Sequence, residues 1–130
     1  MASVIMECRL NCPPERAWAL LSDVAAPQKA FPGVLTDARM ENDERIVTFA
    51  NGAVVRERIV SVDPVRRRIA YVVTGGRFSQ HAAAMQILDD GEYCRLLWAS
   101  DFLPDEVAPL VEALMGQGME ALTRVLAGAP

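Results

Sequence analysis

Glu57 is the residue of this chain best placed for acid–base chemistry. It lies between Arg56 and Arg58 in a segment that alternates like a β-strand, so neighbouring side chains point to opposite faces. With Glu57 facing inward both arginines face solvent, and this orientation buries the least charge. Burial in an apolar pocket raises the pKa of a carboxyl group, which suits proton transfer near neutral pH. The alternative is a buried carboxylate that a neighbour such as His81 or Tyr71 satisfies, and that only anchors a ligand.

His81 and Tyr71 are the other candidate proton carriers. His81 is the only histidine, and it opens a run of small residues, His81-Ala82-Ala83-Ala84-Met85, which leaves space at one point of a curved sheet. Such a histidine is either a polar group with an internal partner or an acid, base or orienting donor in a pocket. Whether the protein is an enzyme stays open, and Glu57, His81 and Tyr71 are candidate catalytic residues only.

The sequence contains no pattern typical of a metal site, a phosphate-binding loop or a catalytic nucleophile. Cys8, Cys12 and Cys94 with one histidine do not have the spacing of a zinc site, so we expect no metal. No glycine-rich phosphate loop follows a strand, and no nucleophile stands with a histidine in an order that this fold assembles. We expect no cofactor. The net charge of −4 and the lack of a basic stripe argue against nucleic acid and anionic membranes as partners.

Length and composition predict one globular domain, residues 1–130. Hydrophobic residues make up 52% of the chain and charged residues 23%, which is enough to build a core without disulfides. The N-terminus has no signal-peptide pattern, and no apolar run is long enough to span a bilayer. Three cysteines, an odd number, without an export signal indicate a reducing compartment. We therefore expect a cytoplasmic protein that does not bind a membrane.

Hydrophobic periodicity predicts a first strand, two short helices, six further strands and a long terminal helix. The short helices are expected near residues 13–22 and 27–31, and the long helix over 104–127. Asn51-Gly52 predicts a type I′ hairpin turn, which needs positive φ at both residues. An antiparallel sheet of this length curls, and the long helix lies in its concave side, so the fold class is α+β. The strands are predicted at 3–10, 34–40, 46–50, 53–62, 68–74, 78–88 and 93–103.

The predicted terminal helix carries a broad apolar face. Leu114 and Gly118 are four residues apart and so share one side of a helix. Gly116 and Gly118 lie mid-helix, where each costs about 1 kcal/mol relative to alanine, and Met115 and Met119 flank them. Either this helix packs closely on the sheet with methionines filling gaps, or it leaves room for a ligand beneath it.

Segments along nearly the whole chain carry a family resemblance, although no single motif is specific. Together and in order they resemble the START-related helix-grip superfamily, which includes polyketide cyclase/dehydrase-like proteins, the birch-pollen-allergen group and plant abscisic acid receptors. The matching segments are Leu10-Asn11-Cys12-Pro13 with Ala17-Trp18-Ala19-Leu20-Leu21-Ser22-Asp23, then Arg56-Glu57-Arg58-Ile59 with Asp63, Tyr71 and Gly75-Gly76, and finally Trp98-Ala99-Ser100-Asp101-Phe102-Leu103-Pro104.

The resemblance implies a helix-grip fold with a hydrophobic pocket between the sheet and the long helix. In the hormone receptors the positions that match Glu57, Tyr71 and Val73 line this pocket. Their gating loop is here only the Asn51-Gly52 turn, and a second loop is short, so a hormone-gated partner interface is not expected. By the same register the ligand-binding residues are expected to be Val55, Glu57, Ile59, Tyr71, Val73, His81, Ala83, Met85, Leu110, Leu114 and Gly118.

The favoured function is binding of a small hydrophobic molecule in that cavity. The alternative is an enzyme of the polyketide cyclase/dehydratase type that uses the glutamate, histidine and tyrosine as proton carriers. A third hypothesis is an interaction module. Asp101 either closes the strand-to-helix turn or marks the cavity mouth. Trp98 has the opposite parity, which places it on the outer face of the sheet, where an exposed tryptophan predicts a homodimer.

Overall fold

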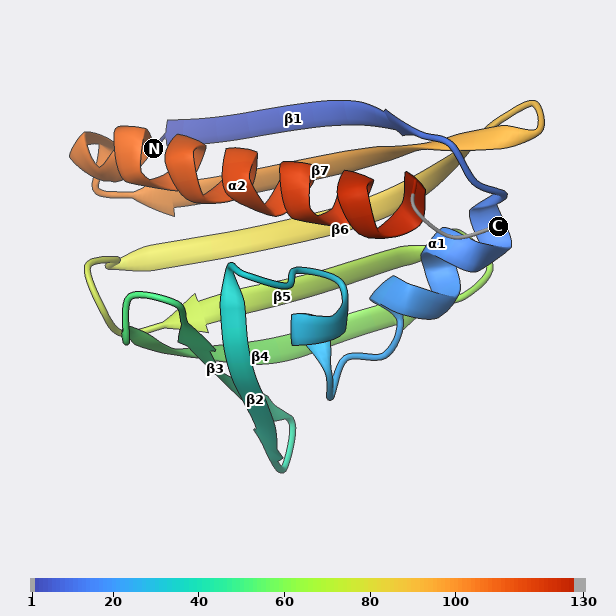
Figure 1. The fold of residues 1–130 in the computed structure, drawn as a ribbon. Helices are drawn as coiled ribbons and strands as arrows, with labels where there is room; N and C mark the ends of the chain where they lie inside the picture. Colours follow the sequence, from blue (N-terminus) through green and yellow to red (C-terminus); the bar gives the residue numbers. More distant parts are fainter. Residues whose placement is uncertain (1, 128–130) are drawn as a thin grey trace.

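The computed structural model describes residues 2–127, which form one curled antiparallel sheet with a long helix across it (Figure 1). The seven strands have the order β1-β7-β6-β5-β4-β3-β2, so β1 joins the sheet beside the last strand. Residues 1 and 128–130 of the predicted domain lie outside the described part. The strands are β1 Ala2–Leu10, β2 Leu35–Glu41, β3 Glu44–Phe49, β4 Val54–Asp63, β5 Arg68–Thr74, β6 Gln80–Asp90 and β7 Tyr93–Leu103.

Helical elements follow β1 and β7. After β1 come α1 (Pro14–Leu21) and η1 (Pro27–Lys29), so the second of the two predicted short helices is a single 3₁₀ turn. After β7, η2 (Asp105–Val107) leads into α2 (Ala108–Ala127), which runs along β1, β7 and β6 (Figure 1). This arrangement confirms the α+β helix-grip fold predicted from the sequence.

The two halves of α2 have different surroundings. Met119, Leu122 and Leu126 are buried in the hydrophobic core, and the sulfur of Met119 lies 3.5 Å from the thiol of Cys8 on β1. The first half, which includes Leu110 and Leu114, borders a cavity instead. The long helix therefore fixes the fold with its second half and leaves its first half facing an open space.

The broad apolar face predicted for α2 is not buried uniformly. Leu110 is 36% exposed and Leu114 is half-buried, whereas Val111 and Met115, one position further along, are 3% exposed each. Leu110 and Leu114 lie beside Val111 and Met115, at the edge of the cavity. Apolar spacing identified the apolar face of the helix, but it did not show which residues of that face are fully buried.

The hairpin between β3 and β4 is not the predicted type I′ turn. Only Gly52 has a positive φ, +91°, whereas a type I′ turn needs a positive φ at Asn51 as well. The N–H of Gly52 donates to the carbonyl of Phe49 (2.9 Å), and the N–H of Phe49 donates to the carbonyl of Ala53 (2.8 Å). This pattern is a three-residue loop with glycine at the left-handed position. The Asn51 side chain accepts from the N–H of Ala53 at 3.0 Å and holds the loop.

Candidate functional site

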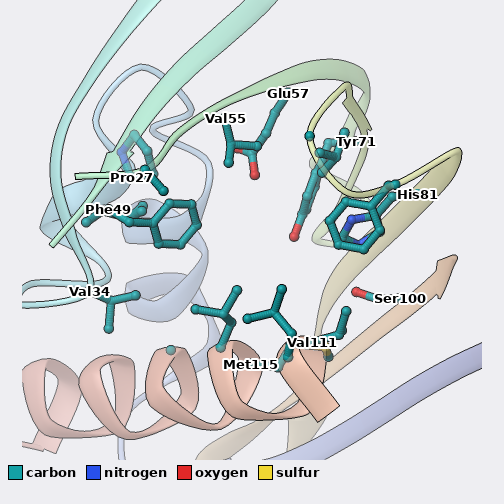
Figure 2. Close-up of a pocket in the computed structure, with 18 of the residues that line it drawn as sticks. Pro27, Val34, Phe49, Val55, Glu57, Tyr71, His81, Ser100, Val111 and Met115 are labelled. Carbon is teal, nitrogen blue, oxygen red and sulfur yellow. The ribbon is translucent and has the colours of Figure 1, made fainter. Parts of the chain in front are cut away.

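A cavity of about 380 Å³ lies between the first half of α2 and the inner face of the sheet, where residues of β3 to β7 line it. Figure 2 shows Val111 and Met115 of α2 on one side and Val55 and Glu57 of β4 on the other. Volumes of this size are typical of small-molecule sites.

The cavity has an apolar end and a polar end. Pro27, Val34 and Phe49 form the apolar end (Figure 2). Tyr71 and His81 point into the space from the opposite side. A mostly apolar lining with a few convergent polar groups is the usual composition of a ligand pocket.

Most of the residues that the sequence places in the pocket line this cavity. They are Val55, Glu57, Tyr71, Val73, His81, Met85, Leu110, Leu114 and Gly118. Ile59 and Ala83 do not line it. Ile59 precedes a bulge in β4 and packs against the core, and Ala83 is 6% exposed between its cross-strand neighbours Tyr71 and Ser100. The small side chain of Ala83 is on the same face as Tyr71 and Ser100, which do line the cavity.

Arg45 on β3 is the site residue that the sequence analysis missed. It lies opposite Glu57 in the β3–β4 register. Its Nε donates to Glu57 Oε1 at 2.8 Å, and its Nη2 lies 2.7 Å from the same oxygen. Its Nη1 donates to the carbonyl of Val24 at 3.2 Å. The two charged side chains are only 8% and 12% exposed, so Glu57 is a buried ion-paired carboxylate rather than an isolated acid held by His81 or Tyr71.

Trp98 does not lie on the outer face of the sheet, so that prediction was wrong. It is 8% exposed, lines the cavity, and donates from Nε1 to the hydroxyl of Tyr71 at 3.2 Å. The predicted alternation with Asp101 is correct, but Asp101 is the exposed outer residue, and it accepts from Ser3 Oγ at 2.5 Å. The predicted homodimer loses this tryptophan as its basis and stays a prediction.

Tyr71 connects the ion pair to the tryptophan. The Arg45 guanidinium carbon lies 5.7 Å from the centre of the Tyr71 ring. Burial, and next the negative charge of Glu57, raise the pKa of Tyr71 well above its usual value of 10. Tyr71 therefore keeps its proton across the physiological range and acts as a hydrogen-bond donor, and this argues against a phenolate base.

His81 has no hydrogen-bond partner on either ring nitrogen among the described residues. Its ring packs against Phe78, with 4.3 Å between centroids, and lies 6.0 Å from Phe102. Desolvation lowers the pKa of His81 below its ordinary value of 6.5, so it is neutral at pH 7. Of the three candidate proton carriers, it is the one whose side chain makes no hydrogen bond at all to the described residues.

The environment of His81 predicts a loss of stability in acid. Because its folded-state pKa lies below 6.5, the unfolded chain binds this proton first as the pH falls. The contribution of neutral His81 is therefore fully present above its unfolded pKa and is lost as the pH drops through 6.5. Urea unfolding at intervals from pH 7.5 to 5 should show a shallower decline for His81→Phe, which keeps an aromatic ring without the titration. Parallel profiles for the two proteins would show that His81 is not desolvated.

The cysteines do not form a nucleophilic site. Burial raises the pKa of the Cys8 thiol, and burial together with the neighbouring Cys12 raises that of Cys94 to about 12. Thiols that stay protonated at neutral pH are poor nucleophiles.

Within residues 2–127 no group of three or more His, Cys, Asp or Glu side chains could hold a metal ion. The same range contains no helix with the length and apolar character needed to cross a membrane.

Comparison with known structures shows the same fold across low sequence identity. Protein XoxI from Bacillus cereus has a TM-score of 0.91 at 16% identity, with 98% of this chain and 97% of that chain covered. An uncharacterised protein from Bacillus thuringiensis has a TM-score of 0.88 at 17% identity, over 97% and 99% of the two chains. Norcoclaurine synthase from Thalictrum flavum, in a truncated form, has a TM-score of 0.79 at 14% identity, over 99% and 95%.

Sequence comparison shows the family. Curated proteins give no match to this chain. A family model described as polyketide cyclase/dehydrase and lipid transport matches residues 1–127, nearly the full length. This chain therefore belongs to the polyketide cyclase/dehydrase and lipid transport family, within the START-related helix-grip superfamily.

Proposed function

We propose that this protein binds a small, largely apolar molecule in the cavity between α2 and the sheet. The observation that carries the proposal is the cavity itself, about 380 Å³ with an apolar end and a few polar groups opposite. Filling such a space with an apolar ligand is favourable, because each Å² of apolar surface removed from water contributes roughly 25 cal/mol. The family description, which includes lipid transport, supports the proposal.

A catalytic role is the second candidate, and one observation favours it. The ring of His81 lines the cavity and is neutral at pH 7, and its two buried nitrogens have no partner among the described residues, so one of them is a free proton acceptor. A norcoclaurine synthase with a similar fold has been solved with dopamine and hydroxybenzaldehyde, so this architecture can hold small aromatic molecules. An enzyme of the cyclase/dehydratase type would use His81 as its base, since Glu57 is ion-paired and Tyr71 holds its proton.

Binding is tested with N-phenyl-1-naphthylamine, a neutral dye whose fluorescence rises in apolar surroundings. We expect saturable binding to the folded protein with a dissociation constant of roughly micromolar size, as for a modest apolar ligand. Leu114→Trp fills the cavity from α2 and should weaken dye binding at least tenfold. The matched control is Val65→Trp, because Val65 is 87% exposed and does not line the cavity.

The comparison between these two variants decides the proposal. Equal dye binding by Leu114→Trp and Val65→Trp, with both variants folded, would place the dye outside the cavity and remove the basis for a ligand site there. The Gly118→Leu variant is less suitable as a blocker, since Gly118 touches Trp98 rather than empty space.

The predicted cytoplasmic location belongs to the same proposal. Cys8, Cys12 and Cys94 are free thiols, which supports a reducing compartment.

A further inference from the structure

Some polar atoms of Arg45, Glu57 and Tyr71, which form the polar wall of the cavity, have protein partners and others have none. Arg45 Nε donates to Glu57 Oε1, and Nη1 donates to the carbonyl of Val24. Its Nη2 lies 2.7 Å from the same oxygen of Glu57. Both contacts to Glu57 go to Oε1. Glu57 Oε2 has no partner among the described residues and is not fully enclosed. Glu57 therefore offers the cavity a hydrogen-bond acceptor, and the positive charge of Arg45 is already balanced by this carboxylate.

Tyr71 offers the opposite function. An indole N–H can only donate, so in the Trp98–Tyr71 bond of 3.2 Å the tyrosine oxygen accepts. The phenolic proton of Tyr71 is therefore left for another acceptor. Trp98 is held in place because the backbone of Gly118 lies against its six-membered ring and Phe31 packs at 5.7 Å between centroids. Trp98 thus orients the Tyr71 hydroxyl.

The remaining charged group at the cavity is Arg77. Its side chain belongs to an exposed residue in the loop between β5 and β6, where water solvates its charge. Inside the cavity the only ionised groups among the lining residues are therefore Arg45 and Glu57, which neutralise each other. A carboxylate that entered would place a further negative charge beside a pair that is already neutral, and taking such an unbalanced charge out of water is costly.

We propose that the cavity selects an electrically neutral molecule with an apolar body and a polar end that carries both an acceptor oxygen and a hydroxyl. The acceptor oxygen binds the Tyr71 hydroxyl proton, and the ligand hydroxyl donates to Glu57 Oε2. The site discriminates against carboxylates such as free fatty acids. This inference rests on the proposed function, since it assigns the ligand class of the same cavity.

Four naphthalene probes of nearly equal shape test the inference. They carry at position 2 an acetyl group, a 1-hydroxyethyl group, a carboxylate or an isopropyl group, and their affinities are measured by titration calorimetry at pH 7.5. Tyr71→Phe should weaken the ketone and the alcohol about fivefold to tenfold, the usual effect of one hydrogen bond, and change the isopropyl probe less than twofold. Tyr93→Phe is the matched control, because Tyr93 does not line the cavity, and it should change none of them.

Glu57→Gln tests the charge selection. With the negative charge removed, the positive charge of Arg45 is left unbalanced, and the carboxylate probe should gain about tenfold while the isopropyl probe stays unchanged. If Glu57→Gln does not fold, the Tyr71→Phe comparison and the wild-type preference for the alcohol over the carboxylate still decide the question.

The outcomes separate this inference from the proposed function. If the isopropyl probe binds wild-type protein but Tyr71→Phe weakens all four probes alike, or none, the ligand class is wrong and the cavity still binds apolar molecules. If the carboxylate binds wild-type protein as tightly as the alcohol, the charge selection is wrong. If no probe binds, the apolar one included, the cavity is not a ligand site and both proposals fall.

Discussion

Arg45→Met is expected to lower the free energy of unfolding by about 3–5 kcal/mol, because it leaves the Glu57 carboxylate buried without its partner. Methionine has a similar length, so little packing is lost. The two side chains are only 8% and 12% exposed, so water solvates the unpaired carboxylate poorly. Urea unfolding monitored by circular dichroism measures the change.

Two further variants isolate the charge effect. The double variant Arg45→Met with Glu57→Gln removes both charges and should recover most of the lost stability, since replacing a buried pair is often close to neutral. Arg39→Met breaks an exposed pair with Glu41, 62% and 46% exposed, and should cost at most about 1 kcal/mol. Equal effects of Arg45→Met and Arg39→Met would mean that the Glu57 carboxylate is well solvated, and the description of the polar wall would then fail.

Gly118→Ala is expected to destabilise the protein by about 1–3 kcal/mol through overpacking, although alanine favours the helix. A Cβ at this position would lie 2.9 Å from the Trp98 ring, closer than van der Waals contact. Trp98 is buried and cannot move freely, because it packs on Phe31 and holds Tyr71. Thermal unfolding gives the shift in midpoint.

Gly116→Ala is the matched control on the same helix. Nothing lies within 4 Å of a Cβ at Gly116, so the helix propensity of alanine should raise the stability by about 1 kcal/mol. Opposite signs for two glycines two residues apart distinguish close packing from a general effect of removing glycine. A stabilised Gly118→Ala would show that the Trp98 ring yields, and the orientation of Tyr71 by this contact would be lost as an argument.

The mid-helix glycines show where the sequence left two interpretations and the structure decided. Gly118 serves close packing, because its missing side chain lets the helix approach Trp98. Room for a ligand comes instead from the first half of α2, where Leu110 and Leu114 border the cavity. The structure therefore supports close packing at Gly118, and room for a ligand beside the first half of the helix stays a prediction.

The sequence by itself determined the order of the elements and nine of the residues that line the cavity. Alternation along β4 and β5 placed Val55, Glu57, Tyr71 and Val73 on one face, because the period of a strand is two and the pairing fixes its parity. The apolar stripe of α2 and the turn residues between strands are local patterns, and such patterns can be recognised in a single sequence. These signals predicted the α+β class, and the family resemblance of segments along the chain predicted the helix-grip fold.

Only the tertiary structure decided which face is inside and which charges meet. Trp98 and Asp101 do lie on opposite faces of the sheet, as predicted, but the two faces were exchanged. Alternation shows which side chains share a face, and it does not show which face the helix covers. Arg45 meets Glu57 through the β3–β4 register, which depends on a three-residue loop rather than the predicted two-residue turn. The ion pair, the donor of Tyr71 and the free oxygen of Glu57 arise from contacts between strands, and no local pattern in the chain encodes them.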